Sequence, residues 1–327
     1  MNMQSIRKFL LSTLKTLILP ALVIGVFALL TNGRSASQRM LLNTIRQSIV
    51  PMLICWGLMM TMSMGMMNFC GGAAMLAAGI IGGNLAQMTG GGIPALLVIC
   101  TVLGVAIGAF IGLLYNKLRV PCMVLTIGLM LFFEAFPRVF FSGGVRATNV
   151  VQLSMAPNCY WVALAMFAVF YVLYECLPFG HNMRAIGASP AISATVGLDA
   201  DKIKFGAFTA SGLFFGVAAA VYISANGEVR NVSAMGSMQI MMDGFMGMFL
   251  ALFMSTFCKL PIAVIVSTFT MKMMSNGFVA LGMNATVRDL ANGVFLLVLL
   301  ALSANSGLLA RIRADKAFRL EAEAERN

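Results

Sequence analysis

Runs of about 20 mainly apolar residues recur along most of this chain, and they constrain its fold more than any other feature. An α-helix of that length crosses the roughly 30 Å hydrocarbon core of a bilayer. The chain is 60% hydrophobic and only 10% charged, whereas soluble domains carry about 25% charged residues. The runs are continuous, so they do not match the alternating strands of about 10 residues in membrane β-barrels. The sequence therefore predicts an all-α, polytopic transmembrane helical bundle.

We predict about ten spans in a single transmembrane domain that comprises residues 1–327. Their approximate limits are 14–31, 48–67, 71–88, 93–115, 120–141, 159–179, 203–224, 239–258, 261–281 and 288–307. Ten crossings place both ends of the chain on one side of the membrane. Most Lys and Arg residues then fall in the loops on that side, so the positive-inside rule predicts cytoplasmic N- and C-termini. Residues 311–327 would form a short cytoplasmic tail.

The beginning of the chain leaves two points open. Its first residues are basic, as in a signal peptide, but Pro20 interrupts the apolar stretch, which favours an uncleaved first span. Arg34, Arg39 and Arg46 are exceptions to the charge asymmetry. The amphipathic region 35–47 either lies in the membrane interface or leads into the second span.

The composition excludes several kinds of site and partner. The net charge of +11 is explained by basic cytoplasmic loops, so no nucleic-acid partner is predicted. The seven cysteines show no metal-binding spacing, and His181 is the single histidine, so no metal site is predicted. The chain has no P-loop pattern GxxxxGK(S/T) and no HExxH or GxSxG motif. We therefore predict no catalytic residue and no cofactor in this chain.

Glycines recur on one face of two predicted spans. Gly104, Gly108 and Gly112 are spaced by four residues, and Gly212 and Gly216 repeat that spacing. Small residues at this spacing let helix backbones approach closely in a membrane. We expect tight helix packing here, with a channel-lining face as the alternative.

The run 64–83 is rich in glycine and predicts a break in a helix. Broken helices at bilayer depth occur where they are buried in protein or line a cavity. We therefore take Asn68, Phe69 and Gly71 as candidates for a pathway across the membrane. A plain loop between two spans is the alternative.

Ionisable side chains within predicted spans are costly and normally have a partner. Glu134 could pair with Arg138 one turn later, and Asp243 could meet Lys272 across a helix hairpin. Glu175 and Lys272 could instead extend to an interface. Structural pairing is the first interpretation, and a role for Glu134 and Asp243 in solute contact or proton transfer is the alternative.

The polar segment 180–204 separates two apolar runs. Ser189 and Pro190 form a helix-start signal, and Gly197 is a typical residue after a helix end. Ile192 and Val196 lie one turn apart and give the short helix an apolar face. We expect this face to dock into a groove on a cytoplasmic partner. An interfacial helix that touches only lipid is the alternative.

This segment resembles the cytoplasmic loop of the permease subunits of ribose-type ABC importers, which take up monosaccharides. The resemblance lies in Gly180, Arg184-Ala185-Ile186-Gly187, Ala191, Ala194, Gly197-Leu198 and Lys202. The segment 119–144 is similar to another pattern of the same family, and the resemblance extends over about 50–305. The chain departs from the family at Asn68, where an aspartate is usual, and at 246–261, which replaces a glycine-rich stretch. It is thus identified as a divergent member.

The resemblance implies a multi-pass protein of the bacterial inner membrane. Two permease subunits, in a homo- or heterodimer, would enclose the path of a small solute, for which a monosaccharide is the default. An extracytoplasmic solute-binding protein would deliver the solute, and a separate ABC ATPase subunit would bind ATP and Mg. The residues that the resemblance assigns to coupling with that ATPase are Arg184, Gly187, Ser189, Pro190, Ile192, Ser193, Val196 and Gly197. The alternatives are an ion-coupled secondary transporter and an ABC importer for nucleosides or branched-chain amino acids.

Overall fold

The computed structural model describes residues 20–31, 37–141, 143–146, 153–154, 157–255 and 258–304. A short apolar helix, Pro20–Leu30, comes first. The further helices are α2 (Gln38–Met62), α3 (Gly71–Thr89), α4 (Gly92–Leu118), α5 (Cys122–Phe140), α6 (Asn158–Tyr171), η2 (Val172–Cys176), α7 (Pro178–Ala188), α8 (Pro190–Thr195), α9 (Ala200–Asn226), α10 (Gly236–Met254), α11 (Leu260–Ala280) and α12 (Ala285–Ala304). The η2 segment is a π-helical turn that continues α6. The predicted tail 311–327 and Arg34 lie outside the described residues.

Seven helical segments are long and apolar enough to cross a membrane. They are α2, α4, α5, α6 together with η2, α9, α10 and α11. The prediction of an all-α, polytopic membrane protein is thereby confirmed. Each of the ten predicted spans overlaps a helix, but Pro20–Leu30 is short, and α3 and α12 are not among the seven. The number ten, the cytoplasmic termini and the single domain stay predictions.

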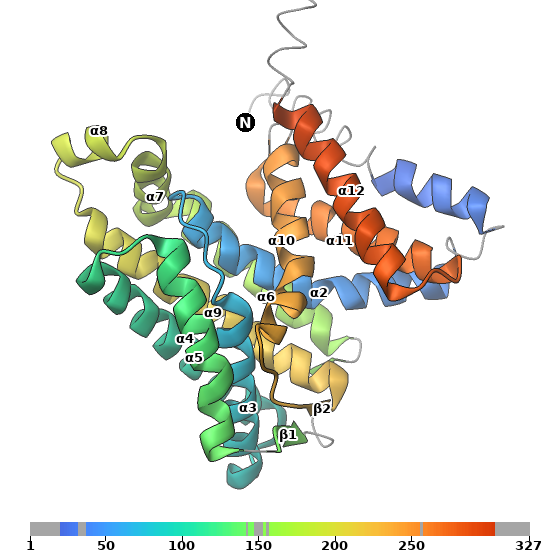
Figure 1. The fold of residues 1–327 in the computed structure, drawn as a ribbon, viewed down its shortest axis with the longest axis horizontal. Helices are drawn as coiled ribbons and strands as arrows, with labels where there is room; N and C mark the ends of the chain where they lie inside the picture. Colours follow the sequence, from blue (N-terminus) through green and yellow to red (C-terminus); the bar gives the residue numbers. More distant parts are fainter. Residues whose placement is uncertain are drawn as a thin grey trace, which may run out of the picture.

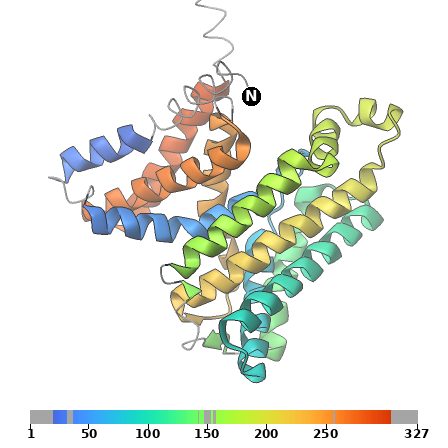
Figure 2. The same ribbon diagram turned by 180° about the vertical axis from the view of Figure 1, so that it is seen from behind.

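Helix α2 lies at the centre of the bundle (Figure 1). It packs against α9, α10 and α11, and Trp56 on α2 is fully buried and stacks on Phe170 of α6. In Figures 1 and 2, α3, α4, α5 and α9 form a group on one side of the molecule, and α10, α11 and α12 form another. The central position of α2 therefore joins the two groups.

Within the region 35–47, the described residues 38–47 belong to α2 rather than to a separate interfacial segment. The helix begins at Gln38 and continues to Met62, and the Ser37 side chain accepts a hydrogen bond from the Met40 amide at its start. The structure therefore agrees with the second predicted alternative, in which this region leads into the second span. The unexpected consequence is that Arg39 and Arg46 lie on a long helix that enters the bundle.

Helices α4 and α9 pack closely along their glycine faces. A Cβ atom at Gly108 would lie 2.9 Å from the Cα of Gly212, and one at Gly104 would lie 2.5 Å from the Cα of Gly216. Real Cβ atoms do not come this close to a backbone, so larger residues would force the helices apart. The interpretation of these glycines as packing residues is confirmed.

The two ends of the bundle differ in structure. At one end, strand β1 (Val145–Arg146) pairs antiparallel with β2 (Glu228–Val229), with Val145 opposite Val229. At the other end, α7 and α8 form a projecting helical loop (Figure 1). We call these the strand end and the α8 end.

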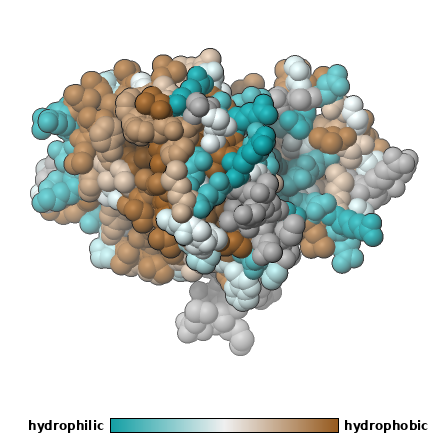
Figure 3. Space-filling view, turned by 90° about the horizontal axis from the view of Figure 1, so that it is seen from below, coloured by the Kyte–Doolittle hydropathy of each residue, from teal (hydrophilic) through white to brown (hydrophobic). Residues whose placement is uncertain are grey.

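Large hydrophobic side chains cover much of the outside of the bundle. Val102 on α4, Val139 on α5 and Trp161 on α6 are each more than half exposed. Seen from the strand end, hydrophobic residues cover a broad part of the surface, and hydrophilic residues gather beside it (Figure 3). A soluble protein rarely exposes such a broad apolar area, whereas a lipid-facing bundle requires it.

Candidate functional site

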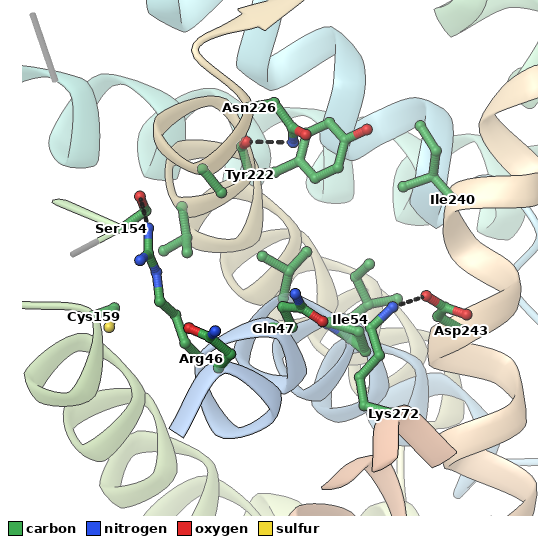
Figure 4. Close-up of a pocket in the computed structure, with 15 residues that line it drawn as sticks. Arg46, Gln47, Ile54, Ser154, Cys159, Tyr222, Asn226, Ile240, Asp243 and Lys272 are labelled. Atoms are coloured by element: carbon green, nitrogen blue, oxygen red, sulfur yellow. Dashed lines mark hydrogen bonds and ion pairs between the residues drawn. The ribbon is translucent and has the colours of Figure 1, made fainter. Parts of the chain in front are cut away.

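A polar cavity of about 620 Å³ lies between α2, α9, α10 and α11 (Figure 4). Tyr222 and Asn226, from the last turns of α9, place it in the half of the bundle near the strand end. The residues that line it are Asn43, Arg46, Gln47, Val50, Pro51, Ile54, Ser154, Cys159, Val221, Tyr222, Ala225, Asn226, Ile240, Asp243 and Lys272. A cavity with this many amides and charges within a membrane bundle is the candidate place for a polar solute.

The Asp243–Lys272 pair forms one wall of this cavity. The Lys272 Nζ atom on α11 donates to the Asp243 Oδ2 atom on α10 at 2.5 Å. The predicted pairing across a helix hairpin is therefore confirmed. Because each charge neutralises the other, the pair is tolerated at this depth. Asp243 and Lys272 also line a small void of about 10 Å³ beside Asn292 on α12, so the pair separates that void from the large cavity.

Polar residues of α2 line other parts of the cavity, and Gln47 lies between Arg46 and the Asp243–Lys272 pair (Figure 4). Arg46 donates through Nη2 to the Ser154 hydroxyl at 3.2 Å, and the Gln47 side-chain oxygen accepts from Asn276 at 3.0 Å. These residues were not predicted from the sequence as part of a site. The signal was present, because Asn43, Arg46 and Gln47 follow helical spacing and so form a polar stripe on one face of α2.

Glu134 lies outside the cavity lining and holds the start of α10. Its Oε2 atom accepts from the Met235 amide at 3.1 Å, and its Oε1 atom accepts from the Ser237 amide at 2.8 Å. A carboxylate suits the positive end of a helix. The suggested pairing with Arg138 is wrong for the described residues, since Arg138 donates to the Val232 carbonyl instead. The pathway role of Glu134 stays a prediction.

Within the glycine-rich run 64–83, the backbone is non-helical only up to Gly71, where α3 begins, and Gly79, Gly82 and Gly83 lie inside the continuous α3. The predicted break is therefore the connection between α2, which ends at Met62, and α3, as in the alternative of a loop between two spans. This stretch is largely buried, and Asn68 is 1% exposed. The Asn68 Oδ1 atom accepts from the Cys70 amide, but among the described residues its Nδ2 atom has no partner. The Phe69 amide donates to the Thr126 hydroxyl at 3.3 Å. This is non-helical backbone buried in protein, as a membrane requires.

None of the three predicted pathway residues in this stretch lines the cavity of about 620 Å³. The ring of Phe69 packs against Phe245, and Gly71 faces the ring of Phe215, so both lie in tight packing. Of the five predicted pathway residues, the structure brings only Asp243 to the cavity.

The cytoplasmic loop predicted from the sequence is a pair of helices, α7 and α8. The predicted short helix begins at Pro190 after the extended residue Ser189, and Gly197 follows it with a φ of 81°. The Ser193 amide donates to the Ser189 carbonyl at 3.1 Å. Val196 is 73% exposed, whereas the side chain of Ile192 lies outside the described residues. The exposed apolar Val196 suits a docking surface.

Two of the predicted coupling residues anchor this loop to the bundle. A Cβ atom at Gly187 would overlap the Ser63 carbonyl, because α7 packs directly on the turn after α2. The Arg184 guanidinium lies 4.9 Å from the centre of the Tyr174 ring and 3.8 Å from the Glu175 carboxylate. A bulky residue at Gly187 is therefore expected to disturb the fold itself.

The link from α8 to α9 is fixed by Asp199. Its Oδ1 atom accepts from the Lys202 amide at 3.2 Å and so caps α9. The hydrogen bond from the Lys202 side chain holds the pKa of the Asp199 carboxyl below its ordinary value. Asp199 is therefore ionised at neutral pH. Among the described residues, no group of three His, Cys, Asp or Glu side chains could hold a metal ion.

Comparison with known proteins shows the family. No solved structure matches the chain. The ribose import permease protein RbsC of Haemophilus influenzae is 23% identical over 198 residues, which cover 56% of this chain and 60% of that relative. The chain thus matches less than two thirds of the relative's length. The sequence model of the family described as branched-chain amino acid transport system / permease component matches residues 40–303. The chain therefore belongs to this family of transport-system permease components.

Proposed function

We propose that this chain is the membrane-spanning permease subunit of an ATP-driven importer for a monosaccharide. The observation that carries the proposal is the placement of two features at opposite ends of one membrane bundle. A polar cavity lies in the half near the strand end, and the exposed α8 projects from the other end (Figure 1). An importer needs a place for a solute on one side and a contact for a motor on the other.

The α8 end would be cytoplasmic and would receive the ATPase. The chain has no P-loop, so ATP and Mg would be bound by separate ABC ATPase subunits. ATP binding can shift the permease between two states only through contacts that differ between those states. Ser189, Pro190, Ser193, Val196 and Gly197 belong to α8 and its flanking turns and are the residues proposed to make these contacts.

The strand end would then face the extracytoplasmic side and a solute-binding protein. This orientation agrees with ten spans and cytoplasmic termini, because it places the basic loops inside. A second permease subunit, identical or different, would complete the pathway in a bacterial inner membrane. The surrounding partner is the lipid bilayer.

The cavity lining supports a sugar as the solute. Its amide and hydroxyl groups come from Asn43, Gln47, Tyr222, Asn226 and Ser154 and match the hydroxyl groups of a monosaccharide. The similar protein of Haemophilus influenzae is named for ribose import. The second candidate solute is a branched-chain amino acid, which the description of the family favours.

Uptake by the reconstituted complex tests the proposal. The chain would be co-expressed with candidate ABC ATPase and solute-binding proteins, purified as a complex and placed in proteoliposomes. We expect uptake of radiolabelled ribose that requires ATP and the binding protein and that ionophores do not affect. Uptake without the ATPase that collapses with an ionophore would instead establish an ion-coupled transporter. Uptake of leucine but not ribose would establish the second candidate.

A further inference from the structure

The cavity of about 620 Å³ carries one positive charge that no carboxylate balances. Its charged lining residues are Arg46, Asp243 and Lys272. Asp243 and Lys272 pair at 2.5 Å and neutralise each other. In the described part of the chain, Arg46 has no carboxylate within 4.0 Å, and its described hydrogen bond is to the neutral Ser154 hydroxyl. An unbalanced charge inside a membrane bundle is costly unless a ligand or water meets it.

The surroundings of Arg46 add to this positive potential. Cys159, in the first turn of α6, lines the same part of the cavity as Arg46 (Figure 4). The N-terminus of a helix carries a partial positive charge. The last turn of α9 brings the opposite partial charge, but its Tyr222 carbonyl already accepts from the Asn226 side chain at 2.8 Å. The Arg46 side of the cavity is therefore suited to an anionic group.

Side chains that can form hydrogen bonds with the hydroxyl groups of a solute lie next to Arg46 in the cavity. The side chain of Asn43 and the phenol of Tyr222 line the cavity and make no hydrogen bond to other described residues. The Gln47 side-chain oxygen accepts from Asn276, which leaves the Gln47 amide nitrogen to donate. These groups offer both donors and acceptors to a solute that bears several hydroxyl groups.

We propose that this cavity binds a polyhydroxylated solute with a single carboxylate, that is, the acid form of a monosaccharide. The carboxylate lies against Arg46 and the hydroxyls face Asn43, Gln47 and Tyr222. This inference rests on the proposed importer function and narrows its substrate class. A zwitterionic amino acid fits less well, because its ammonium group needs a carboxylate and Asp243 already binds Lys272.

Binding of three small probes to the full-length chain tests this assignment. The protein would be held in phosphatidylcholine nanodiscs, so that no anionic lipid competes for Arg46. Ribose, ribonate and leucine are titrated separately, and binding is followed by saturation-transfer NMR. We expect ribonate to bind about tenfold more tightly than ribose, since a charge-assisted hydrogen bond contributes about 1.5 kcal/mol or more.

Two variants separate the role of Arg46 from a general charge effect. Arg46→Gln removes the charge at the cavity, and we expect it to abolish the preference for ribonate while binding of ribose persists. Arg39→Gln removes an exposed charge from the same helix outside the cavity lining, and we expect it to keep the preference. Size-exclusion chromatography of both variants confirms that they remain folded.

Several results would overturn the inference. Equal affinity of the unaltered protein for ribose and ribonate would do so, as would no binding of ribonate at all. A preference for ribonate that survives in Arg46→Gln would place the anion elsewhere, and tighter binding of leucine than of ribonate would favour a zwitterion. ATP-dependent uptake of ribose with no preference for ribonate would refute this inference while the proposed importer function stands.

Discussion

Replacement of Glu134 should destabilise the bundle, because this one side chain holds the start of α10. The carboxylate is 6% exposed and accepts from two backbone amides, those of Met235 and Ser237. A hydrogen bond to a charged group contributes about 1.5–3 kcal/mol, and a carboxylate at a helix N-terminus adds up to about 1 kcal/mol. We therefore expect Glu134→Ala to lower the free energy of unfolding by about 3–5 kcal/mol. Glu134→Gln retains an acceptor for one amide and should lose about half as much.

Thermal unfolding in detergent, followed with a thiol-reactive fluorescent dye, measures this loss. Cys176 is exposed and reacts in the folded protein, whereas Cys55, Cys70 and Cys100 are buried, so the further rise in dye signal reports when the bundle opens. At about 2–4 °C per kcal/mol, Tm should fall by roughly 10 °C in Glu134→Ala and by roughly 5 °C in Glu134→Gln. Glu228→Ala is the matched control, because this carboxylate lies at the strand end and, in the described part of the chain, its ion pairs are with the exposed Arg146 and Arg230.

If Glu134→Ala unfolds at the same temperature as the unaltered protein, Glu134 does not stabilise the start of α10. A different outcome would support the alternative that the sequence left open. If Glu134→Gln keeps its Tm but the reconstituted complex no longer takes up solute, Glu134 acts on the solute or on a proton rather than as a helix cap.

Three further changes test other parts of the structure. Gly108→Leu should prevent folding, because the backbones of α4 and α9 touch at this glycine. Gly128→Leu on α5 should fold, because a Cβ atom added there meets no atom within 4 Å. The yield of monodisperse protein in size-exclusion chromatography distinguishes the two variants. Val196→Asp should leave the Tm unchanged and strongly reduce co-purification of the ATPase subunit. If the ATPase subunit co-purifies in full, Val196 does not belong to the docking surface. Asp243→Asn and Lys272→Met should each lower the free energy of unfolding by about 1 kcal/mol, a small loss because the ion pair is partly exposed. The double variant leaves no unpaired charge and should recover most of this loss.

Local features of the sequence were sufficient to predict the helices and one ion pair. Apolar runs of the required length predicted each of the seven helical segments that could cross a membrane, because a membrane selects helices by length and composition. The start signal at Ser189 and Pro190 located α8, since helix ends depend on the nearest few residues. Asp243 and Lys272 could be paired because they lie on consecutive helices that a short loop folds together.

The cavity and the partner of Glu134 depend on contacts between distant parts of the chain. Glu134 bonds to amides about 100 residues later, so nearby sequence suggested Arg138 instead. Arg46 lies in region 35–47, which the sequence left either in the membrane interface or as the lead into the second span, and no site was predicted there. Arg46 lines the cavity because α2 packs beside α9, a contact between segments far apart in the sequence. Gly187 was predicted only as a coupling residue, yet it lies at a close backbone contact with Ser63 that only the folded chain reveals.

The arrangement of α2 connects the cavity to the proposed motor contact. Its residues Asn43 to Ile54 contribute to the cavity lining, and the turn that follows it, at Ser63, carries α7 through the close contact with Gly187. The helix has 25 residues and is about 37 Å long. Pro51 lies within it and has no amide hydrogen to donate to the preceding turn, which weakens the helix where it lines the cavity. A displacement of α7 and α8 would therefore reach the cavity wall directly, and α2 would bend most easily beside the Asp243–Lys272 pair.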